Sequence, residues 1–289
     1  TPMRYAWDLQ HQYLREQHFD GRLRGVIARA ILHRARIWDT RTSNGVDHFI
    51  ACSKYIGRRI WKAYRRHSDV IYPGVDTSYF QIGGTRKDYY FTSSRMVPYK
   101  KIPLIIEAFQ KMPDKKLIVI GDGPQYGDAV KKAGPNVSVL GYQPDDVLLK
   151  HMQEAKAFIF MAEEDFGITP LEAQACGTPV LAFGRGGALE TVIDGKTGFH
   201  FHEQSAQAVC DVVAKFENSE VTFDPAAIRR HAERFSIPRF RSEFRELVMA
   251  KWQAHSRAGA AKKDGAKNEA GVRDGDYRTG RRLPDEAAA

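Results

Sequence analysis

The sequence predicts an α/β protein built on a parallel doubly wound sheet. Two apolar runs of strand length, 157–161 and 178–183, are each followed by a glycine-containing loop and then by a helical pattern. Strand and helix patterns alternate in the same way along most of the chain, which is typical of parallel sheets covered by helices. Open α/β sheets bind ligands at the carboxyl ends of their strands, so we expect a site in the loops that follow the strands.

The first 75 residues contain a short succession of helix and strand patterns. We expect a helix over most of 1–39, a strand at 46–53, a helix at 54–64 and a short strand at 70–72. The turn Pro73-Gly74-Val75-Asp76 then separates this part from a new alternation of strands and helices. We therefore place a domain boundary near residue 76.

Beyond the turn, one long alternation predicts a second domain. The predicted strands are 89–93, 116–120, 137–140, 157–161, 178–183 and 197–202, and the predicted helices include 103–111, 125–133, 145–152, 204–217 and 224–250. Another helix is expected to start at Thr169, with Thr as N-cap, Pro170 at the first helical position and Glu172 completing a capping box. We assign 76–222 to the second domain, 223–254 to helices that pack back across the domains, and 255–289 to a disordered tail poor in large apolar residues.

The composition indicates a globular protein. With 289 residues and 43% hydrophobic content, the chain can bury one or two cores. It has no apolar run of about 18 residues and no signal-peptide pattern. Cys52, Cys176 and Cys210 are widely separated without metal-ligand spacing, which favours buried thiols in a reducing compartment. Because the sequence begins at Thr1 in mid-pattern, we expect an amino-terminal truncation.

The net charge of +9 is unevenly placed. Residues 1–80 contain 14 Lys and Arg against 7 Asp and Glu, the tail 255–289 contains 8 against 6, and the middle is neutral with 22 of each. A basic amino-terminal part predicts an anionic partner, either a membrane surface or an acidic substrate; the alternative is solvated helix faces rich in arginine. Nucleic acid is not favoured, because the tail has Tyr277 as its only aromatic residue.

Two nucleotide-binding motifs are near matches that fail. Gly195-Lys196-Thr197 looks like the end of a P-loop, but the earlier glycine that a P-loop requires falls at Glu190. Gly121-Asp122-Gly123 follows a strand, but the third glycine of the dinucleotide fingerprint falls at Tyr126. The sequence therefore argues against a P-loop and against a nicotinamide site, but it remains consistent with Rossmann-like geometry.

Two carboxylates, Glu164 and Glu172, are the first candidates for a site. Glu164 lies in the loop after strand 157–161; the alternative to a ligand-binding role is that this loop is only a solvated acidic loop. Glu172 could be explained by the capping box alone. Residues 166–169 stand at a helix N-terminus, where unpaired N–H groups and the helix dipole favour an anion such as a diphosphate. Since carboxylates repel phosphate, we expect the pair to face sugar hydroxyls, which favours a sugar nucleotide.

A basic loop follows the strand 89–93. Arg95 and Lys100 flank Pro98 there, again at the carboxyl end of a strand. Their charges are suited to neutralising a diphosphate and to stabilising it as a leaving group. The alternative is an exposed basic loop without a ligand.

Taken in order, these motifs resemble those of the retaining glycosyltransferases of family 4. The matching stretches are 73–76, 94–101, 120–124, 140–142, 164–180, 186–187 and Glu190. Proteins of that family have the GT-B fold of two facing Rossmann-like domains. The resemblance covers roughly residues 40–250 and implies one complete donor domain with a parallel doubly wound sheet, preceded by the carboxyl-terminal part of a partial second, acceptor-side Rossmann-like domain.

The resemblance also implies roles for individual residues. Glu172 would bind the ribose hydroxyls and Glu164 the hydroxyls of the donor sugar, while Arg95 and Lys100 would bind the diphosphate. Backbone amides toward phosphate and sugar are implied for Phe166, Gly167, Ile168 and Thr169. The base pocket is implied to be lined by Gly141 and Tyr142. No metal and no cofactor are expected. One departure is Lys101, which stands where the family usually has glycine.

Two segments point to the subgroup of bacterial polysaccharide mannosyltransferases. Residues 1–8 are similar to an acceptor-side segment of those enzymes, and residues 184–191 are similar to a second segment. By this analogy GDP-mannose is the preferred donor, transferred directly and with retention to a lipid-linked saccharide during synthesis of cell-surface polysaccharide. We expect the protein to be cytoplasmic and peripherally bound at the inner face of the plasma membrane.

Because only about 75 residues remain for the acceptor side, we expect this chain to bind a sugar nucleotide but to transfer poorly or not at all. Three alternatives stay open: a glycosyltransferase that uses a UDP-sugar, a phosphorylase or epimerase acting on a UDP-sugar, and a sugar-nucleotide or polyanion-binding module without catalysis.

Overall fold

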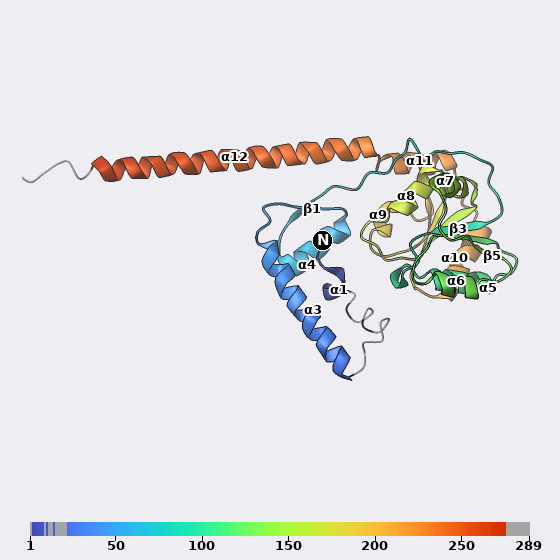
Figure 1. Ribbon diagram of the computed structural model, residues 1–289. Helices are drawn as coiled ribbons and strands as arrows, with labels where there is room; N and C mark the ends of the chain where they lie inside the picture. Colours follow the sequence, from blue (N-terminus) through green and yellow to red (C-terminus); the bar gives the residue numbers. More distant parts are fainter. Residues whose placement is uncertain (1, 9, 11–13, 15–21, 276–289) are drawn as a thin grey trace, which may run out of the picture. The chain divides into compact units, whose positions relative to one another are not determined.

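The structure is a computed structural model that describes residues 2–8, 10, 14 and 22–275, with side chains for 2–8, 10, 14 and 23–257 (Figure 1). The chain forms two compact units, Thr1–Arg241 and Ser242–Ala289. The first unit contains two separate parallel sheets, one of six strands and one of two.

The order of strands in the larger sheet decides where its loops come together. Across the sheet the order is β5 (Val137–Val139), β4 (Leu117–Ile120), β3 (Tyr90–Ser93), β6 (Ala157–Phe160), β7 (Val180–Phe183) and β8 (Gly198–Phe201). The chain forms β3 in the middle, continues outward to β5, returns to β6 beside β3, and then continues outward in the other direction. The loops after β3 and β6 therefore diverge at a topological switch point.

Helices cover both faces of this sheet. They are α5 (Ile102–Gln110), α6 (Tyr126–Lys132), α7 (Asp145–Glu154), α8 (Ile168–Ala175), α9 (Ala188–Thr191), α10 (Ala206–Asn218) and α11 (Pro225–Glu233). Neighbouring strand residues point to opposite faces: Tyr90 packs in a cluster with apolar residues of α5 and α10, and Phe91 packs in another with residues of α7, α8 and α11. The predicted doubly wound sheet is confirmed, and the strand ends differ from the prediction by at most two residues.

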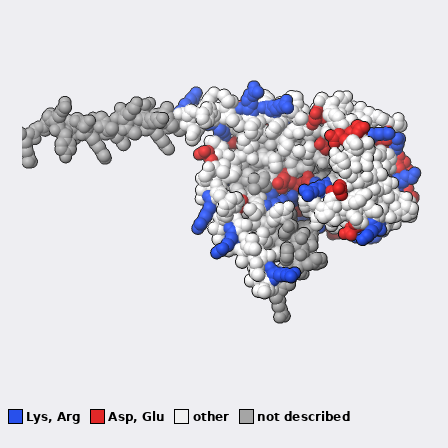
Figure 2. Space-filling view, in the orientation of Figure 1, with Lys and Arg blue, Asp and Glu red and all other residues white. Residues whose placement is uncertain are grey.

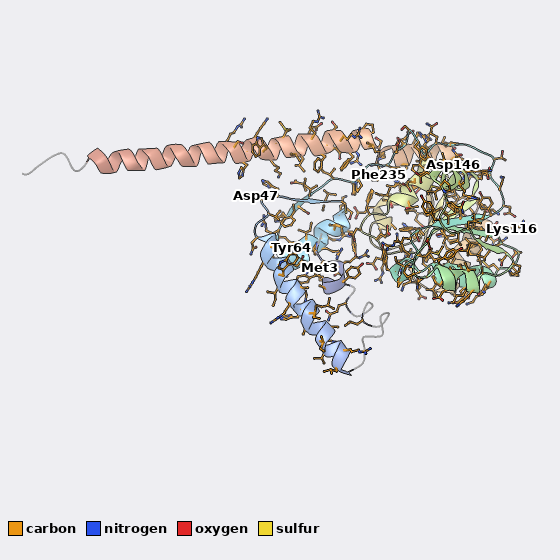
Figure 3. All side chains as sticks on the ribbon, in the orientation of Figure 1. Met3, Asp47, Tyr64, Lys116, Asp146 and Phe235 are labelled. Carbon is orange, nitrogen blue, oxygen red and sulfur yellow. The ribbon has the colours of Figure 1, made fainter. Side chains whose placement is uncertain are left out.

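The smaller sheet pairs β1 (Phe49–Ala51) with β2 (Ser68–Val70) and is accompanied by α1 (Arg4–Trp7), α3 (Arg22–Ser43) and α4 (Lys54–Tyr64). Asp39 of α3 joins these helices: its Oδ2 accepts from Met3 N at 3.3 Å, Trp7 Nε1 at 2.7 Å and Tyr64 Oη at 2.8 Å. Met3 and Tyr64 are labelled in Figure 3. The predicted helix 54–64 is confirmed, whereas the strand predicted at 70–72 lies at Ser68–Val70.

The helix predicted at 224–250 is interrupted. α11 ends at Glu233, and α12 (Ile237–Gly275) begins after a break at which the linker between the sheets is bound. Val75 N donates to Phe235 O at 2.7 Å, and Ile237 N donates to Val75 O at 3.1 Å. The helix stops because these backbone groups pair with the linker, and Pro238 in the first turn then suits the start of the next helix.

The prediction of a disordered tail is wrong for residues 255–275, which continue α12 as a helix. Low apolar content does not prevent a helix here, because Ala, Lys, Arg and Glu are strong helix formers and proline is absent between Pro238 and Pro284. The rest of the predicted tail, 276–289, lies outside the described residues.

The predicted domain limits stay predictions. The limit near residue 76 falls between the two sheets, whereas the compact units divide after Arg241. In the described part of the chain, no helix combines the length and apolar content needed to cross a bilayer. Cys52, Cys176 and Cys210 are free thiols.

Candidate sugar-nucleotide site

The loops that leave the switch point carry the residues expected to bind a diphosphate and a sugar. Arg95 and Lys100 follow β3, the latter in the 3-10 helix Pro98–Lys100, and Glu164 follows β6. Lys101 comes next and has a left-handed backbone, with φ 59° and ψ 26°. Glycine adopts this conformation without strain, which gives a physical reason for glycine at that position in the family that the sequence resembles.

A cavity of about 350 Å³ opens at this edge of the sheet. Four of the predicted site residues line it: Arg95, Tyr142, Thr169 and Glu172. Further lining residues are Ser93, Ser94, Ile120, Gly121, Asp122, Gln143, Asp145 and Leu148. The cavity is therefore bounded by residues from the ends of β3 and β4, the region around the start of α7, and the first turns of α8.

Six predicted site residues lie outside the cavity wall: Lys100, Gly141, Glu164, Phe166, Gly167 and Ile168. Gly141 contributes to the wall indirectly, because its carbonyl accepts from Gly121 N at 2.8 Å and joins two of the loops. The Phe166 ring belongs to the core, where it lies 5.6 Å from the Tyr72 ring and 5.8 Å from the Phe235 ring. Nothing in these contacts tests the predicted role of its backbone amide.

Glu164 and Lys100 form a close ion pair. Both side chains are largely buried, at 19% and 13% exposure, and the Lys100 ammonium lies 5.5 Å from the centre of the Tyr99 ring. Sequence reasoning found no structural partner for Glu164, and the structure supplies one. A buried pair needs both members, since removing either one leaves an uncompensated charge.

The backbone next to Glu164 is fixed by a glycine from the loop after β7. Gly187 N donates to Glu164 O at 2.8 Å. A Cβ at position 187 would stand 2.3 Å from Phe166 Cα, so no larger residue fits without displacing one of the two loops. The loop that carries Glu164 is therefore seated directly on the loop 184–187.

The predicted capping box at Thr169 and Glu172 is wrong. α8 begins at Ile168, and its N-cap residue is Gly167, with φ 85° and no side-chain cap. Because glycine accepts this backbone conformation, the helix starts before Thr169, and neither Thr169 nor Glu172 caps it. Both residues line the cavity instead.

The pKa of Glu172 is strongly raised. Burial lifts it from 4.5 to about 7, and the Asp145 carboxylate adds to the shift. An acid with a pKa near neutrality and no structural partner marks a functional site more often than a structural one.

Five polar residues of the wall were missed by sequence reasoning: Ser93, Ser94, Asp122, Gln143 and Asp145. Asp122 is the second residue after β4, and Gln143 and Asp145 come soon after β5, so the rule that pointed to Arg95 applies to them too. Among the described residues, no cluster of three or more His, Cys, Asp and Glu is arranged to hold a metal ion.

Residues 78–235, more than half of the chain, match the protein family described as glycosyl transferases group 1. The chain belongs to this family. The family resemblance inferred from the motifs at 94–101 and 164–180 is thereby confirmed. The matched residues begin just after the linker at 73–76 and end within the break between α11 and α12.

Relatives with curated names include mycobacterial mannosyltransferases. A GDP-mannose-dependent alpha-(1-6)-phosphatidylinositol monomannoside mannosyltransferase of Mycolicibacterium smegmatis is 30% identical over an alignment of 201 residues that covers 58% of this chain and 52% of that protein. A D-inositol 3-phosphate glycosyltransferase of Mycobacteroides abscessus is 27% identical over an alignment of 240 residues that covers 74% of this chain and 52% of that protein. This chain thus spans about half the length of the curated relatives it matches.

Solved glycosyltransferase structures share the fold. Anabaena Alr3699/HepE in complex with UDP and glucose superposes with a TM-score of 0.65 at 21% identity, over 78% of this chain and 74% of that one. Sucrose-phosphate synthase of Thermosynechococcus elongatus gives 0.65 at 20% identity, over 72% and 59%. The expected GT-B type of α/β fold is confirmed.

We expect Gly187→Ala to lower the free energy of unfolding by about 1–3 kcal/mol, because the added methyl group overpacks the contact with Phe166. Gly127→Ala in α6 is the matched control. A Cβ there meets nothing within 4 Å, and alanine favours the helix by up to about 1 kcal/mol. Urea denaturation followed by circular dichroism measures both; equal effects would contradict the close approach of the two loops.

We expect Glu172 to make stability fall as pH rises from 4.5 toward 7. Between these values the folded chain keeps a proton on Glu172 that the unfolded chain has lost, so its contribution is full below pH 4.5 and is lost through about pH 7. The contribution is on the order of 3 kcal/mol. Denaturation across this window should show a shallower decline for Glu172→Gln than for the wild type. Parallel curves would count against the raised pKa.

Proposed function

We propose that this protein is a retaining, metal-independent hexosyltransferase that takes a sugar nucleotide as donor, preferably GDP-mannose, and a lipid-linked saccharide as acceptor. The observation that carries the proposal is the cavity at the switch point, which Arg95, Thr169 and Glu172 line together, with the Lys100–Glu164 pair on the loops after β3 and β6. Family membership supports the reaction class, and the named relatives support the donor.

In this proposal each charged residue binds one part of the donor. Glu172, on the cavity wall, accepts from the ribose hydroxyls once it is ionised. Arg95 contacts the diphosphate, and Lys100 exchanges part of its contact with Glu164 for a phosphate oxygen. Glu164 is then available to accept from hydroxyls of the donor sugar. A lysine ammonium has three N–H donors and suits such a shared contact.

The proposed chemistry is direct transfer. The bond between the anomeric carbon and the diphosphate breaks while the acceptor oxygen forms a new bond on the same face of the sugar, and the acceptor proton passes to a departing phosphate oxygen. Arg95 and Lys100 stabilise the negative charge that develops on the leaving group. No protein nucleophile takes part.

The carboxylate of Asp145 in the cavity wall favours a guanine nucleotide as the donor. The N1–H and N2 amino groups of guanine form an edge of adjacent donors, which a carboxylate matches, whereas uracil presents one N–H between two carbonyl oxygens. Asp145 and Gln143 lie on the same cavity as Tyr142. The UDP-sugar alternative is kept because several solved structures of similar fold contain UDP.

A peripheral position at the cytoplasmic face of a membrane is part of the proposal. α3 exposes several large apolar side chains, among them Leu23 at 74% and Ile31 at 62%. The same helix contains Arg22, Arg24, Arg29, Arg34, Arg36 and Arg41. Figure 2 shows basic side chains on the surface around α3 with little acid among them. Arginine beside apolar side chains suits a surface of anionic lipids.

The decisive experiment is titration of the chain with GDP-mannose, UDP-glucose and UDP-N-acetylglucosamine, followed by measurement of nucleotide diphosphate release with and without a lipid-linked acceptor. We expect GDP-mannose to bind most tightly. Glu164→Gln should lower any acceptor-dependent release at least a hundredfold. It should also lower the melting temperature, because the largely buried Lys100 ammonium loses the charge of its partner. Absence of binding for all three donors would contradict the proposal, and tighter binding of a UDP-sugar would replace the donor.

Asp145→Asn tests whether Asp145 selects a guanine base over uracil. The amide presents a donor where guanine also has a donor, so affinity for GDP should fall about tenfold or more, while affinity for UDP stays the same or rises. Isothermal titration measures both. Asp146→Asn, the neighbouring residue outside the cavity wall, is the control and should change neither affinity. A fall for both nucleotides would show that Asp145 does not select the base.

A further inference from the structure

The acidic loop Glu163-Glu164-Asp165 is contacted on both sides of Glu164 by the N-terminal end of α4. The Tyr55 hydroxyl donates to Glu163 Oε1 at 2.8 Å, and the Ser53 hydroxyl donates to Asp165 O at 2.5 Å. Ser53 is fully buried and is also the N-cap of α4, accepting from Ile56 N at 3.1 Å. The loop that carries Glu164 is thus attached to a helix that precedes the larger sheet by many residues.

Arg59, one turn further along α4, joins Asp165 to the amino-terminal segment. Its Nη1 donates to Asp165 Oδ1 at 3.2 Å, its Nε to Asp8 Oδ2 at 2.5 Å and its Nη2 to Pro2 O at 3.3 Å. The Arg59 side chain is only 6% exposed. A planar guanidinium directs separate N–H groups to these three acceptors, which a lysine ammonium on a flexible stem does less rigidly.

A second carboxylate fixes the position of α4 itself. Glu190 in α9 accepts from Lys54 N at 2.9 Å, Tyr55 N at 2.8 Å and the Tyr72 hydroxyl at 3.0 Å. The first amides of a helix have no partner within it, and a carboxylate there is also favoured by the helix dipole. α4 therefore cannot shift without breaking contacts to two loops of the larger sheet.

We propose that Arg59 is a positioning residue for Glu164: by holding Asp165, it fixes the direction in which the neighbouring carboxylate meets the donor sugar. The inference rests on the proposed function, in which Glu164 binds hydroxyls of that sugar. Gly187 holds the loop through the carbonyl of Glu164, and Arg59 holds it through the next side chain. The Tyr55 and Ser53 hydroxyls hold the same loop, and the Arg4 guanidinium lies 3.7 Å from Asp165 Oδ1 and donates to Glu163 O. Together these attachments leave the Glu164 side chain little freedom to turn away.

The test compares the affinities of GDP and GDP-mannose by isothermal titration, because their ratio isolates the contacts made by the sugar. In Arg59→Met we expect the preference for GDP-mannose over GDP to fall about tenfold, while the affinity for GDP itself changes by less than about twofold. Arg59→Lys should fall between Arg59→Met and the wild type. Lys62→Met is the matched control, since Lys62 is on the same helix, is 74% exposed and approaches Asp8 but not the loop.

Two more variants separate positioning from loss of folding. Asp165→Asn changes no residue of α4 and should lower the preference about threefold, since the contacts of this side chain with Arg59, and with Arg4 at 3.7 Å, lose their charge. In the double variant of Arg59→Met with Glu164→Gln, the loss should equal that of Glu164→Gln alone, because Arg59 acts through Glu164. Additive losses would overturn the inference, as would an unchanged preference in Arg59→Met and Asp165→Asn.

The wild type distinguishes this inference from the proposed function. A wild-type chain that binds no sugar nucleotide contradicts the proposed function. A wild-type chain that prefers GDP-mannose, and keeps that preference in Arg59→Met, contradicts the positioning role alone.

Discussion

The reversal of strand order between β3 and β6 is the constraint on which the candidate site depends. Two neighbouring parallel strands send their chains to opposite sides, so Arg95 and Lys100 on one loop and Glu164 on the other stand at a common edge without being near in sequence. The burial of every residue of β6 and β7 keeps this edge rigid. Rigid strands let charged groups of opposite sign be placed close together, where a flexible loop would let them separate into solvent.

Much of the larger sheet could be predicted from the sequence because its strands are short and almost wholly apolar. That pattern requires burial on both faces, and the loops after the strands then follow as the place for a ligand. Local rules failed where two of them competed. Thr169 has every feature of an N-cap, yet Gly167 starts the helix earlier, and the change turns Glu172 from a cap into a residue of the cavity wall.

Partners across long sequence separations could not be predicted. Nothing near Glu164 in the sequence points to Lys100, and nothing near Glu190 points to the first amides of α4, 135 and 136 residues away. These contacts are products of the tertiary fold, whereas periodicity reports only on a residue's own helix or strand. The prediction of disorder at 255–275 failed for the opposite reason. Local helix propensity favours the helix there, without the apolar burial that the prediction took to be necessary.

The attachment of α4 to Glu190 has a consequence for the evolution and engineering of such proteins. A helix whose first amides are satisfied by a carboxylate of α9, which packs on the six-stranded sheet, cannot be transferred to another protein by itself. Recombination at the linker 73–76 would separate Ser53 and Arg59 from the acidic loop that they hold, and the graft would carry an unsatisfied helix end into its new host. A crossover that respects these contacts would have to lie before Ser53, so that α4 is inherited together with the six-stranded sheet.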